Sequence, residues 1–322
     1  MRTLISCLVC AAVVPCVAAD NKAVLWARPG NVTVADWTWG PGGEARAPKG
    51  PFEFVAEDFK GTNPKIKVRD ANGERWTMKF GGEDHGDVFA ARLLYALGYE
   101  AQSSYFVRGG TVTGAHGLKR ARPFLGKHGE FAYSRFKQHD SKKVTLVEDM
   151  DWSWTDNPFV GTHELNGLKI VMMLMSNWDA KDSRDGKGSN TAIYARSGSG
   201  GRELQYAFDD WGATLGKWGG FFSRDKWNAE GYSDQTSSFV RIDGDAIRWG
   251  YRGKHNADIT SGIRVDDVQW LLTYLSGVTD EELRAGLRAS GATPSDTDTY
   301  ARAIRERISQ LQRVADGVKS TR

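Results

Sequence analysis

The sequence predicts an α+β protein with two lobes, and two observations support this prediction. Short segments of alternating apolar and polar residues, typical of strands, fill residues 65–125 together with one helical segment. From about residue 265 onward, apolar residues recur instead at helical spacing. Strands with one helix, followed by a mainly helical half, favour a smaller strand-rich lobe and a larger helical lobe.

The composition is that of a globular protein without a strong charge bias. Of the 322 residues, 40% are hydrophobic and 26% are charged, which suits a chain with a sizeable core. The formal net charge of +3 gives no electrostatic reason to expect a nucleic-acid partner or a membrane surface. Beyond the first 19 residues no apolar run is long enough for a transmembrane segment, so we expect none.

Residues 1–19 have the pattern of a secretory signal peptide. Arg2 supplies the positive charge, residues 4–14 are almost wholly apolar, and Val17-Ala18-Ala19 provides small residues for cleavage. We therefore expect an exported protein, periplasmic or secreted. All three cysteines lie within this segment, so the mature chain would rely on packing rather than on disulfides.

The rest of the chain divides by composition into three parts. Residues 20–59 are rich in glycine and proline and predict a loose N-terminal extension. Residues 60–125 form the predicted N-lobe, with strands and one helix. Residues 126–322 form the predicted C-lobe, which begins with a long insertion at 126–158 where few apolar residues are periodic.

The N-lobe elements follow from local patterns. Residues 65–70 and 75–80 alternate and flank the turn signal Ala71-Asn72-Gly73, which predicts a β-hairpin. Apolar residues at i, i+4, i+7 and i+8 predict a helix over residues 85–97, and Gly98 ends it. Further strands are expected at 105–107 and 118–125.

The C-lobe elements are placed in the same way. Residues 163–176 predict a buried helix, and residues 191–195 and 204–208 predict two short strands. Thr293-Pro294 is a helix-cap signal with proline at the first helical position. Residues 300–314 then place an apolar residue on one face of a final helix at nearly every turn.

Two acidic loops flank the expected strand pair. The stretch "SNWDAKDSRDGKGSN", residues 176–190, follows the apolar run 170–175 directly, and Asp209-Asp210-Trp211-Gly212 follows the second strand. A carboxylate from each loop and an amide oxygen would then lie near one point. Such oxygen ligands suit Mg²⁺ or Mn²⁺, with phosphate oxygens completing the shell. Solvated loops and a tight turn with a core tryptophan are the plainer alternatives.

Four stretches, taken in order, carry a resemblance to a known superfamily: "VRDANGERWTMKFG", "DVFAARLLYALGY", "NWDAKD…SNTAIY" and "FDDWGATLG". Over about residues 60–215 the chain resembles the atypical protein-kinase-like superfamily. This superfamily includes the HipA-type kinases, the phosphoinositide lipid kinases and the secreted casein-kinase-like enzymes. Within it, the chain looks most like an uncharacterised group of exported bacterial proteins. The resemblance implies a two-lobed protein-kinase-like fold with a small strand-rich N-lobe and a larger, mainly helical C-lobe.

In the N-lobe the resemblance implies a nucleotide-phosphate anchor. Lys79 matches the lysine that holds the phosphates, and Asp87 matches its acidic partner, with Glu83 as a substitute. A solvated strand lysine and a carboxylate favoured by the helix dipole are the alternatives. No glycine-rich loop precedes Lys79, where the sequence has only the turn at residues 70–73.

In the C-lobe the resemblance implies the catalytic and metal-binding residues. Asp179 matches the catalytic-loop aspartate, and Lys181 stands in the place of a charge-neutralising lysine. Asn190 and Asp210 match the two metal ligands. Asp179 and Asn190 are eleven positions apart, against five in protein kinases, so this loop carries an insertion.

Two functions of different class remain open from the sequence. The first is a metal-dependent phosphotransferase of atypical kinase type that uses Mg or Mn with ATP or another phosphoryl donor. Its acceptor would be an unidentified exported protein, glycan or small molecule. The second is a catalytically inactive kinase-like module that binds protein or glycan through aromatic loops at residues 218–222 and Trp227.

Overall fold

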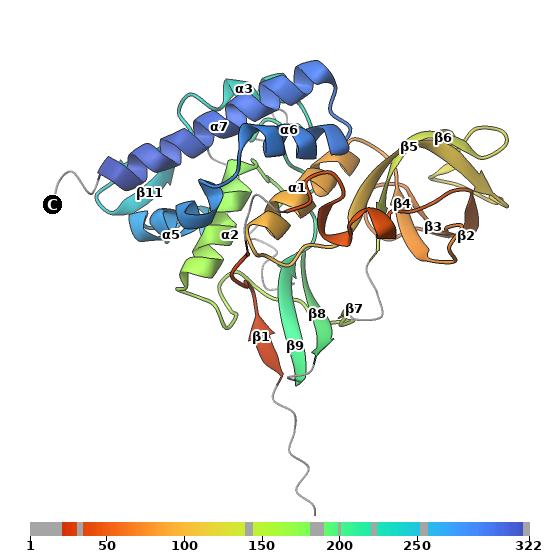
Figure 1. Ribbon diagram of the computed structural model, residues 1–322, viewed down its shortest axis with the longest axis horizontal. Helices are drawn as coiled ribbons and strands as arrows, with labels where there is room; N and C mark the ends of the chain where they lie inside the picture. Colours follow the sequence, from red (N-terminus) through yellow and green to blue (C-terminus); the bar gives the residue numbers. More distant parts are fainter. Residues whose placement is uncertain are drawn as a thin grey trace, which may run out of the picture.

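The computed structural model of the protein shows a mixed α+β fold (Figure 1). The predicted signal peptide lies outside the described residues. Among the residues that the structure describes, no helix is both long and apolar enough to cross a bilayer. The structure describes residues 21–30, 35–138, 144–180, 190–198, 201–219, 224–251 and 257–317.

Five strands form a closed barrel in the order β2-β3-β4-β6-β5. Its interior is an apolar cluster that includes Ile66, Val68 and Met78. Successive side chains along a strand point to opposite faces, so the strand residues directly before and after each of these three face outward. The β3–β4 pair confirms the predicted hairpin. The strands are β2 (Phe52–Asp58), β3 (Lys65–Arg69), β4 (Arg75–Lys79), β5 (Ser104–Thr113) and β6 (Glu130–Lys137).

Helix α1 (Asp84–Ala96) lies between the barrel and the rest of the protein (Figure 1). Almost all of its residues are buried, because it packs against β5 and β6 on one side and against the larger core on the other. It ends at Ala96, and the chain turns at Gly98, whose φ of +88° favours glycine. A Cβ there would lie 2.1 Å from the backbone oxygen of Ala27, so only glycine fits. The helix predicted over 85–97 is confirmed.

The larger core surrounds helix α2, as predicted for residues 163–176, although the helix ends at Leu174. Its N-cap is Thr162, whose side chain accepts a hydrogen bond from the backbone N–H of Leu165. A four-stranded sheet of order β1-β9-β8-β7 lies below it in Figure 1. These strands are β1 (Lys22–Val24), β7 (Val144–Leu146), β8 (Thr191–Gly198) and β9 (Gly201–Phe208).

From residue 265 onward the described chain is helical, as predicted. Its last helix begins at Pro294, and the hydroxyl of Thr293 accepts a hydrogen bond from the N–H of Asp296. The helices are α2 (His163–Leu174), α3 (Ala229–Asp234), α4 (Ala257–Thr260), α5 (Val265–Leu275), α6 (Asp280–Ala289) and α7 (Pro294–Gly317), beside the strands β10 (Val240–Asp243) and β11 (Ala246–Trp249) and the 3₁₀ turns η2 (Gly40–Gly42), η3 (Glu44–Arg46) and η4 (Arg122–Phe124).

Three predictions from the sequence are wrong. The predicted extension 20–59 contains β1, which pairs with β9, and β2, which closes the barrel. The predicted insertion 126–158 contains β6, one of the barrel strands. The sequence pattern did not indicate it, because its outward charged residues are buried by partners elsewhere in the chain. The barrel therefore extends over residues 52–137. The strand expected at 118–125 is replaced by η4, where Pro123 cannot donate to a strand ladder.

Arg307 on α7 fixes the end of α2. Its side chain is fully buried and donates to the backbone oxygens of Leu174 at 3.0 Å and Tyr232 at 2.9 Å. It also donates to the hydroxyl of Ser176 at 2.7 Å. Ser176 has a left-handed φ of 54°, so this contact stabilises the turn from which the first acidic loop begins.

Replacing Arg307 with methionine should lower the free energy of unfolding by about 3 kcal/mol, because several buried oxygens each lose a charged hydrogen-bond donor at once. Urea denaturation of both proteins measures the difference. The control is Arg313→Met on the exposed side of the same helix, where the ion pair with Glu306 is solvated. That change should stay within about 0.5 kcal/mol. Equal losses in the two variants would contradict the anchoring role of Arg307.

Candidate functional site

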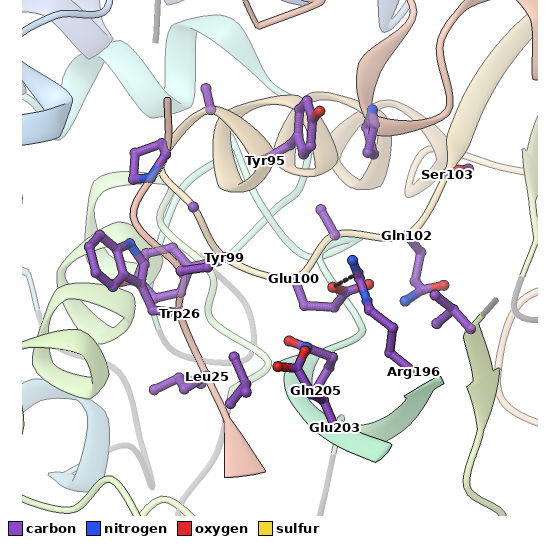
Figure 2. A pocket seen from close by; sticks show the side chains of 18 of the residues that line it. Leu25, Trp26, Tyr95, Tyr99, Glu100, Gln102, Ser103, Arg196, Glu203 and Gln205 are labelled. Carbon is purple, nitrogen blue, oxygen red and sulfur yellow. Dashed lines mark hydrogen bonds and ion pairs between the residues drawn. The ribbon is translucent and has the colours of Figure 1, made fainter. Parts of the chain in front are cut away.

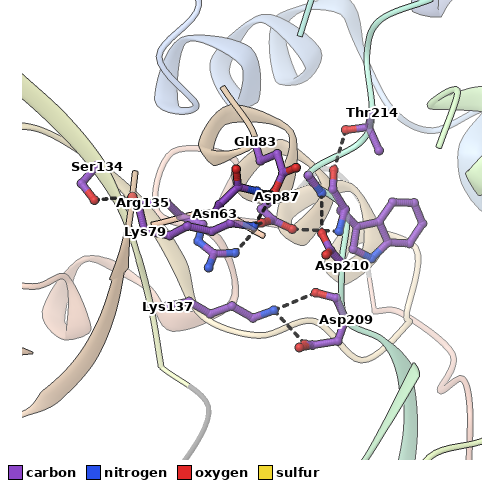
Figure 3. Close-up of polar contacts among 12 residues, drawn as sticks. Asn63, Lys79, Glu83, Asp87, Ser134, Arg135, Lys137, Asp209, Asp210 and Thr214 are labelled. Atoms are coloured by element: carbon purple, nitrogen blue, oxygen red, sulfur yellow. Dashed lines mark hydrogen bonds and ion pairs between the residues drawn. The ribbon is translucent and has the colours of Figure 1, made fainter. Parts of the chain in front are cut away.

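Lys79, the last residue of β4, lies in a buried ion-pair cluster at the start of α1 (Figure 3). Its ammonium nitrogen is 2.7 Å from Glu83 Oε2 and 4.0 Å from Asp87 Oδ2. The prediction that Lys79 lies within reach of Asp87 or Glu83 is therefore confirmed. The expected order of the two is wrong, since Glu83 is the close partner and Asp87 the distant one. The longer glutamate side chain, one turn earlier, reaches back to the strand end.

Asp87 is bound instead by two other parts of the chain. Arg135 on β6 forms a short ion pair with its Oδ2, and the backbone N–H of Trp211 donates to Oδ1 at 2.8 Å. Burial alone would raise the pKa of Asp87, but the charges of Arg135 and Lys79 hold that pKa below its usual value. The carboxylate thus joins α1, β6 and the Asp-Trp-Gly turn.

Glu83 gathers two further segments around Lys79. Lys226 donates to Glu83 Oε1 at 2.5 Å, and the amide of Asn63 donates to Oε2. Burial would raise the pKa of Glu83, but Lys79 and Lys226 lower it below its usual value, so the carboxyl group is ionised. Glu83 therefore links Lys79 to the loop before β3 and to the segment after Asp210.

The loop between β2 and β3, residues 59–64, lies at the same end of the barrel as Lys79. Lys65 pairs in register with Lys79, and the N–H of Phe80 donates to Pro64 at 3.0 Å. The guanidinium of Arg120 donates to the carbonyl oxygens of residues 59, 61 and 62. The turn at 70–73, by contrast, connects the opposite ends of β3 and β4.

The second acidic loop is fixed by β6. The ammonium group of Lys137 donates to the backbone oxygen of Asp209 at 2.9 Å and to its Oδ1 at 2.7 Å (Figure 3). The hydroxyl of Tyr194 donates to the same Oδ1 at 2.9 Å. Sequence reasoning missed Arg135 and Lys137. Their alternation with apolar residues in "SRFK" was the available signal.

The two acidic loops are joined by asparagine side chains. The amide of Asn177 donates to the backbone oxygen of Asp210 at 3.2 Å, and its Oδ1 accepts from the N–H of Asp179 at 3.1 Å. The amide of Asn190 donates to Asp179 Oδ2 at 3.3 Å, and its backbone oxygen accepts from Asp209. Asn190 has a left-handed φ of 65°, which asparagine tolerates. Asp179, Asn190 and Asp210 are therefore neighbours.

Asp210 belongs to the second acidic loop and also lies beside the ion-pair cluster around Lys79. Burial, followed by the charge of Asp87, raises the pKa of Asp210, while Lys79 lowers it in part. The backbone N–H of Gly212 donates to its Oδ1 at 3.1 Å. A cation at this carboxylate would favour its ionised form. Lys181, the remaining predicted catalytic residue, lies outside the described residues.

The donor set fits an ion that shares its shell with a ligand. Among the described residues, no three His, Cys, Asp or Glu side chains gather where they could hold a metal. Asp210 and Asn190 offer one carboxylate and one amide oxygen. A Mg²⁺ or Mn²⁺ ion there would take its other oxygens from phosphate and water, as magnesium does in sites with few protein ligands.

Where the structure describes them, the aromatic residues of this segment after Gly212 pack against other parts of the protein. Trp218 is buried, so the prediction that it binds a ligand is wrong. The ring of Trp227 stacks on His85 with centroids 4.8 Å apart and also packs on Tyr300 at 4.9 Å. Residues 220–222, the rest of that predicted loop, lie outside the described part of the chain.

A large cavity of about 1590 Å³ lies on one face of the β1-β9-β8-β7 sheet, away from Lys79 (Figure 2). Trp26, Tyr99 and Gln205 are among its lining residues. Arg196 forms an ion pair with Glu100 at 2.7 Å on its wall, and burial raises the pKa of Glu100. None of the predicted site residues lines it. A second ion pair on its wall joins Lys22 to Glu203 at 3.5 Å.

Asp84 is a fully buried carboxyl group beside the Lys79 cluster. Burial raises its pKa to about 8, although the charges of Arg135 and Lys79 oppose the shift. Asp84 is therefore protonated at neutral pH, and the ionised charge of the cluster comes from the other acids.

The folded-state pKa of Asp84 lies above its unfolded value of about 3.9, so the folded protein holds one extra proton between about pH 4 and pH 8. Stability falls with rising pH in that window. Asp84→Asn removes this dependence. Its free energy of unfolding relative to wild type should rise by up to about 1.4 kcal/mol per pH unit.

Urea denaturation at several values between pH 5 and pH 7.5 measures this slope. The control is Asp298→Asn, at an exposed carboxylate paired with Arg284, for which the difference from wild type should stay constant over the range. A pH-independent difference for Asp84→Asn would contradict the assignment of a protonated carboxyl.

No family model and no curated protein matches the sequence. Among solved structures, the chain is similar to the crystal structure of a Helicobacter pylori proinflammatory kinase, CtkA. The TM-score is 0.48 and the sequence identity 13%, and the alignment covers 80% of this chain and 94% of that chain.

Proposed function

We propose that the protein is a metal-dependent phosphotransferase with a kinase-like arrangement of its site. In this proposal Lys79 holds donor phosphates, and Asp210 and Asn190 hold Mg²⁺ or Mn²⁺. Asp179 orients the acceptor hydroxyl and takes its proton. The phosphoryl group passes from the donor oxygen to the acceptor oxygen, so catalysis depends on positioning and on neutralising charge.

The observation that carries this proposal is that hydrogen bonds connect both acidic loops to the ion-pair cluster of Lys79 and Glu83. Asp87 is 4.0 Å from Lys79 and accepts the N–H of Trp211, which directly follows Asp210. The Asp210 backbone is in turn tied to Asp179 through the amide of Asn177. A phosphate anchor, a metal carboxylate and a base are thereby held in one connected network.

The chemistry of each group suits its proposed step. A Lys79 ammonium group already paired with Glu83 stays charged: burial opposes the charge, but Asp87 and the other nearby acids raise the pKa of Lys79. Asp179 accepts a hydrogen bond from the amide of Asn190, which orients its carboxylate. The loop of residues 59–64 lies beside Lys79, because Asn63 and Lys79 both bind Glu83, so a phosphate held by Lys79 would lie next to this loop.

The compartment in which the protein acts bears on which phosphoryl donor it uses. If residues 1–19 direct export, the protein meets little ATP, and another phosphoryl donor becomes the natural alternative. The acceptor would be an exported protein, a glycan or a small molecule with a hydroxyl group. Localisation of the protein and assays with nucleotide and non-nucleotide donors address these two points.

Two aspartate variants separate the proposed roles. Asp210→Ala should abolish the metal-dependent thermal shift with ATP and the phosphotransfer activity together, because a site with so few protein ligands cannot lose its carboxylate. Asp179→Ala should keep most of the binding and lose turnover by about 10²- to 10⁴-fold, as expected for a general base.

The matched control is Asp298→Ala, at an exposed carboxylate on α7 that should change neither quantity. Thermal-shift and calorimetric titrations with Mg²⁺ or Mn²⁺, beside a phosphotransfer assay, compare the four proteins. If the wild-type protein binds neither ATP nor a non-nucleotide polyphosphate in the presence of either ion, the proposed function is wrong.

A further inference from the structure

Three cationic side chains form one row across the outer face of the barrel. Lys65 on β3 pairs in register with Lys79 on β4, and Lys79 pairs with Arg135 on β6. Residues directly opposite one another in antiparallel strands project to the same face. Like charges in such positions destabilise a sheet unless something compensates them.

The acidic partner of each cation lies farther away in the order Arg135, Lys79, Lys65. Arg135 forms a close ion pair with Asp87, and Lys79 has Glu83 at 2.7 Å. Lys65 has Asp58 at 3.9 Å, at the outer limit of an ion pair. Of the three cations in the described structure, Lys65 is therefore the one with the weakest counter-charge.

Lys65 is also the member of the row nearest to solvent. Its side chain is 23% exposed, compared with 11% for Lys79 and 6% for Arg135. It directly follows the loop of residues 59–64, and the charges that act on it include those of Lys79, Arg135 and Asp210. An anion that enters beside this loop would meet Lys65 together with Lys79.

We propose that Lys65 is a second phosphate-binding lysine, and that it selects a ligand with two or more linked phosphate groups. This inference rests on the proposed function and specifies its donor. A single phosphate can be held by one lysine and the metal. An anion that reaches from a metal at Asp210 past Lys79 to Lys65 must be several atoms long, as a chain of linked phosphates is. Nucleoside triphosphates and inorganic polyphosphate share this chemistry.

The test compares Lys65→Met with Lys67→Met in the full mature chain. Lys67 is on the same strand and the same outward face, one row further on opposite Thr77, and is exposed. Lys65→Arg keeps the charge. Calorimetry with Mn²⁺ measures the binding of tripolyphosphate, ATP, AMP and orthophosphate. Melting of each unliganded protein separates lost binding from lost folding.

Lys65→Met should weaken the binding of tripolyphosphate and of ATP by about tenfold to a hundredfold, the usual effect of losing a charge-assisted hydrogen bond. Binding of AMP and orthophosphate, already weaker in the wild type, should change little. Lys65→Arg should retain most of the affinity, and Lys67→Met should behave like wild type. The unliganded Lys65→Met protein should melt at the wild-type temperature or above it, because repulsion within the row is relieved.

Three results would overturn the inference. One is equal affinity of Lys65→Met and Lys67→Met for tripolyphosphate while the wild type binds it, which would leave the proposed function standing. Another is wild-type affinity for orthophosphate equal to that for tripolyphosphate. The third is a loss confined to ATP, which would place Lys65 against the nucleoside. Wild-type protein that binds none of these probes with Mn²⁺ or Mg²⁺ would overturn the proposed function itself.

Discussion

The buried carboxylate of Asp87 is the contact on which the candidate site depends. It accepts from Arg135 on β6 and from the backbone of Trp211, so one side chain of α1 fixes a barrel strand and the turn that carries Asp210. Ion pairs buried in this way contribute little net stability, because desolvation offsets the attraction between the charges. Their effect here is geometric: if α1 moves, the acidic turn and the end of β4 must move with it.

The parts that sequence reasoning found are those fixed by local patterns. The β3–β4 hairpin and α1 have clear periodicity and clear end signals, so neighbouring residues were enough to place them. Asp179, Asn190 and Asp210 were proposed together because they lie in the acidic loops on either side of the β8–β9 strand pair and match motifs of the resembled superfamily. The chain then folds back through one hairpin, β8–β9, whose two ends bring both acidic loops to one place.

The parts that sequence reasoning missed depend on partners distant in the chain. Strand β6 resembled a polar insertion because Arg135 and Lys137 are buried only through Asp87 and Asp209, 48 and 72 residues away. The preference of Lys79 for Glu83 over Asp87 depends on side-chain reach, which spacing alone does not determine. Strand β2 was hidden because most of its outward side chains are charged or exposed, so only closure of the barrel identifies it.

The anchoring of Ser176 by Arg307 bears on how the site is assembled during synthesis. Residue 307 leaves the ribosome long after the acidic loops, and domains form from the N-terminal side as the chain emerges. Until α7 docks, the carbonyl of Leu174 and the hydroxyl of Ser176 lack the hydrogen bonds that the guanidinium of Arg307 donates. A nascent chain can therefore complete its barrel early, while the turn that leads to Asp179 acquires its final shape only after α7 has been made.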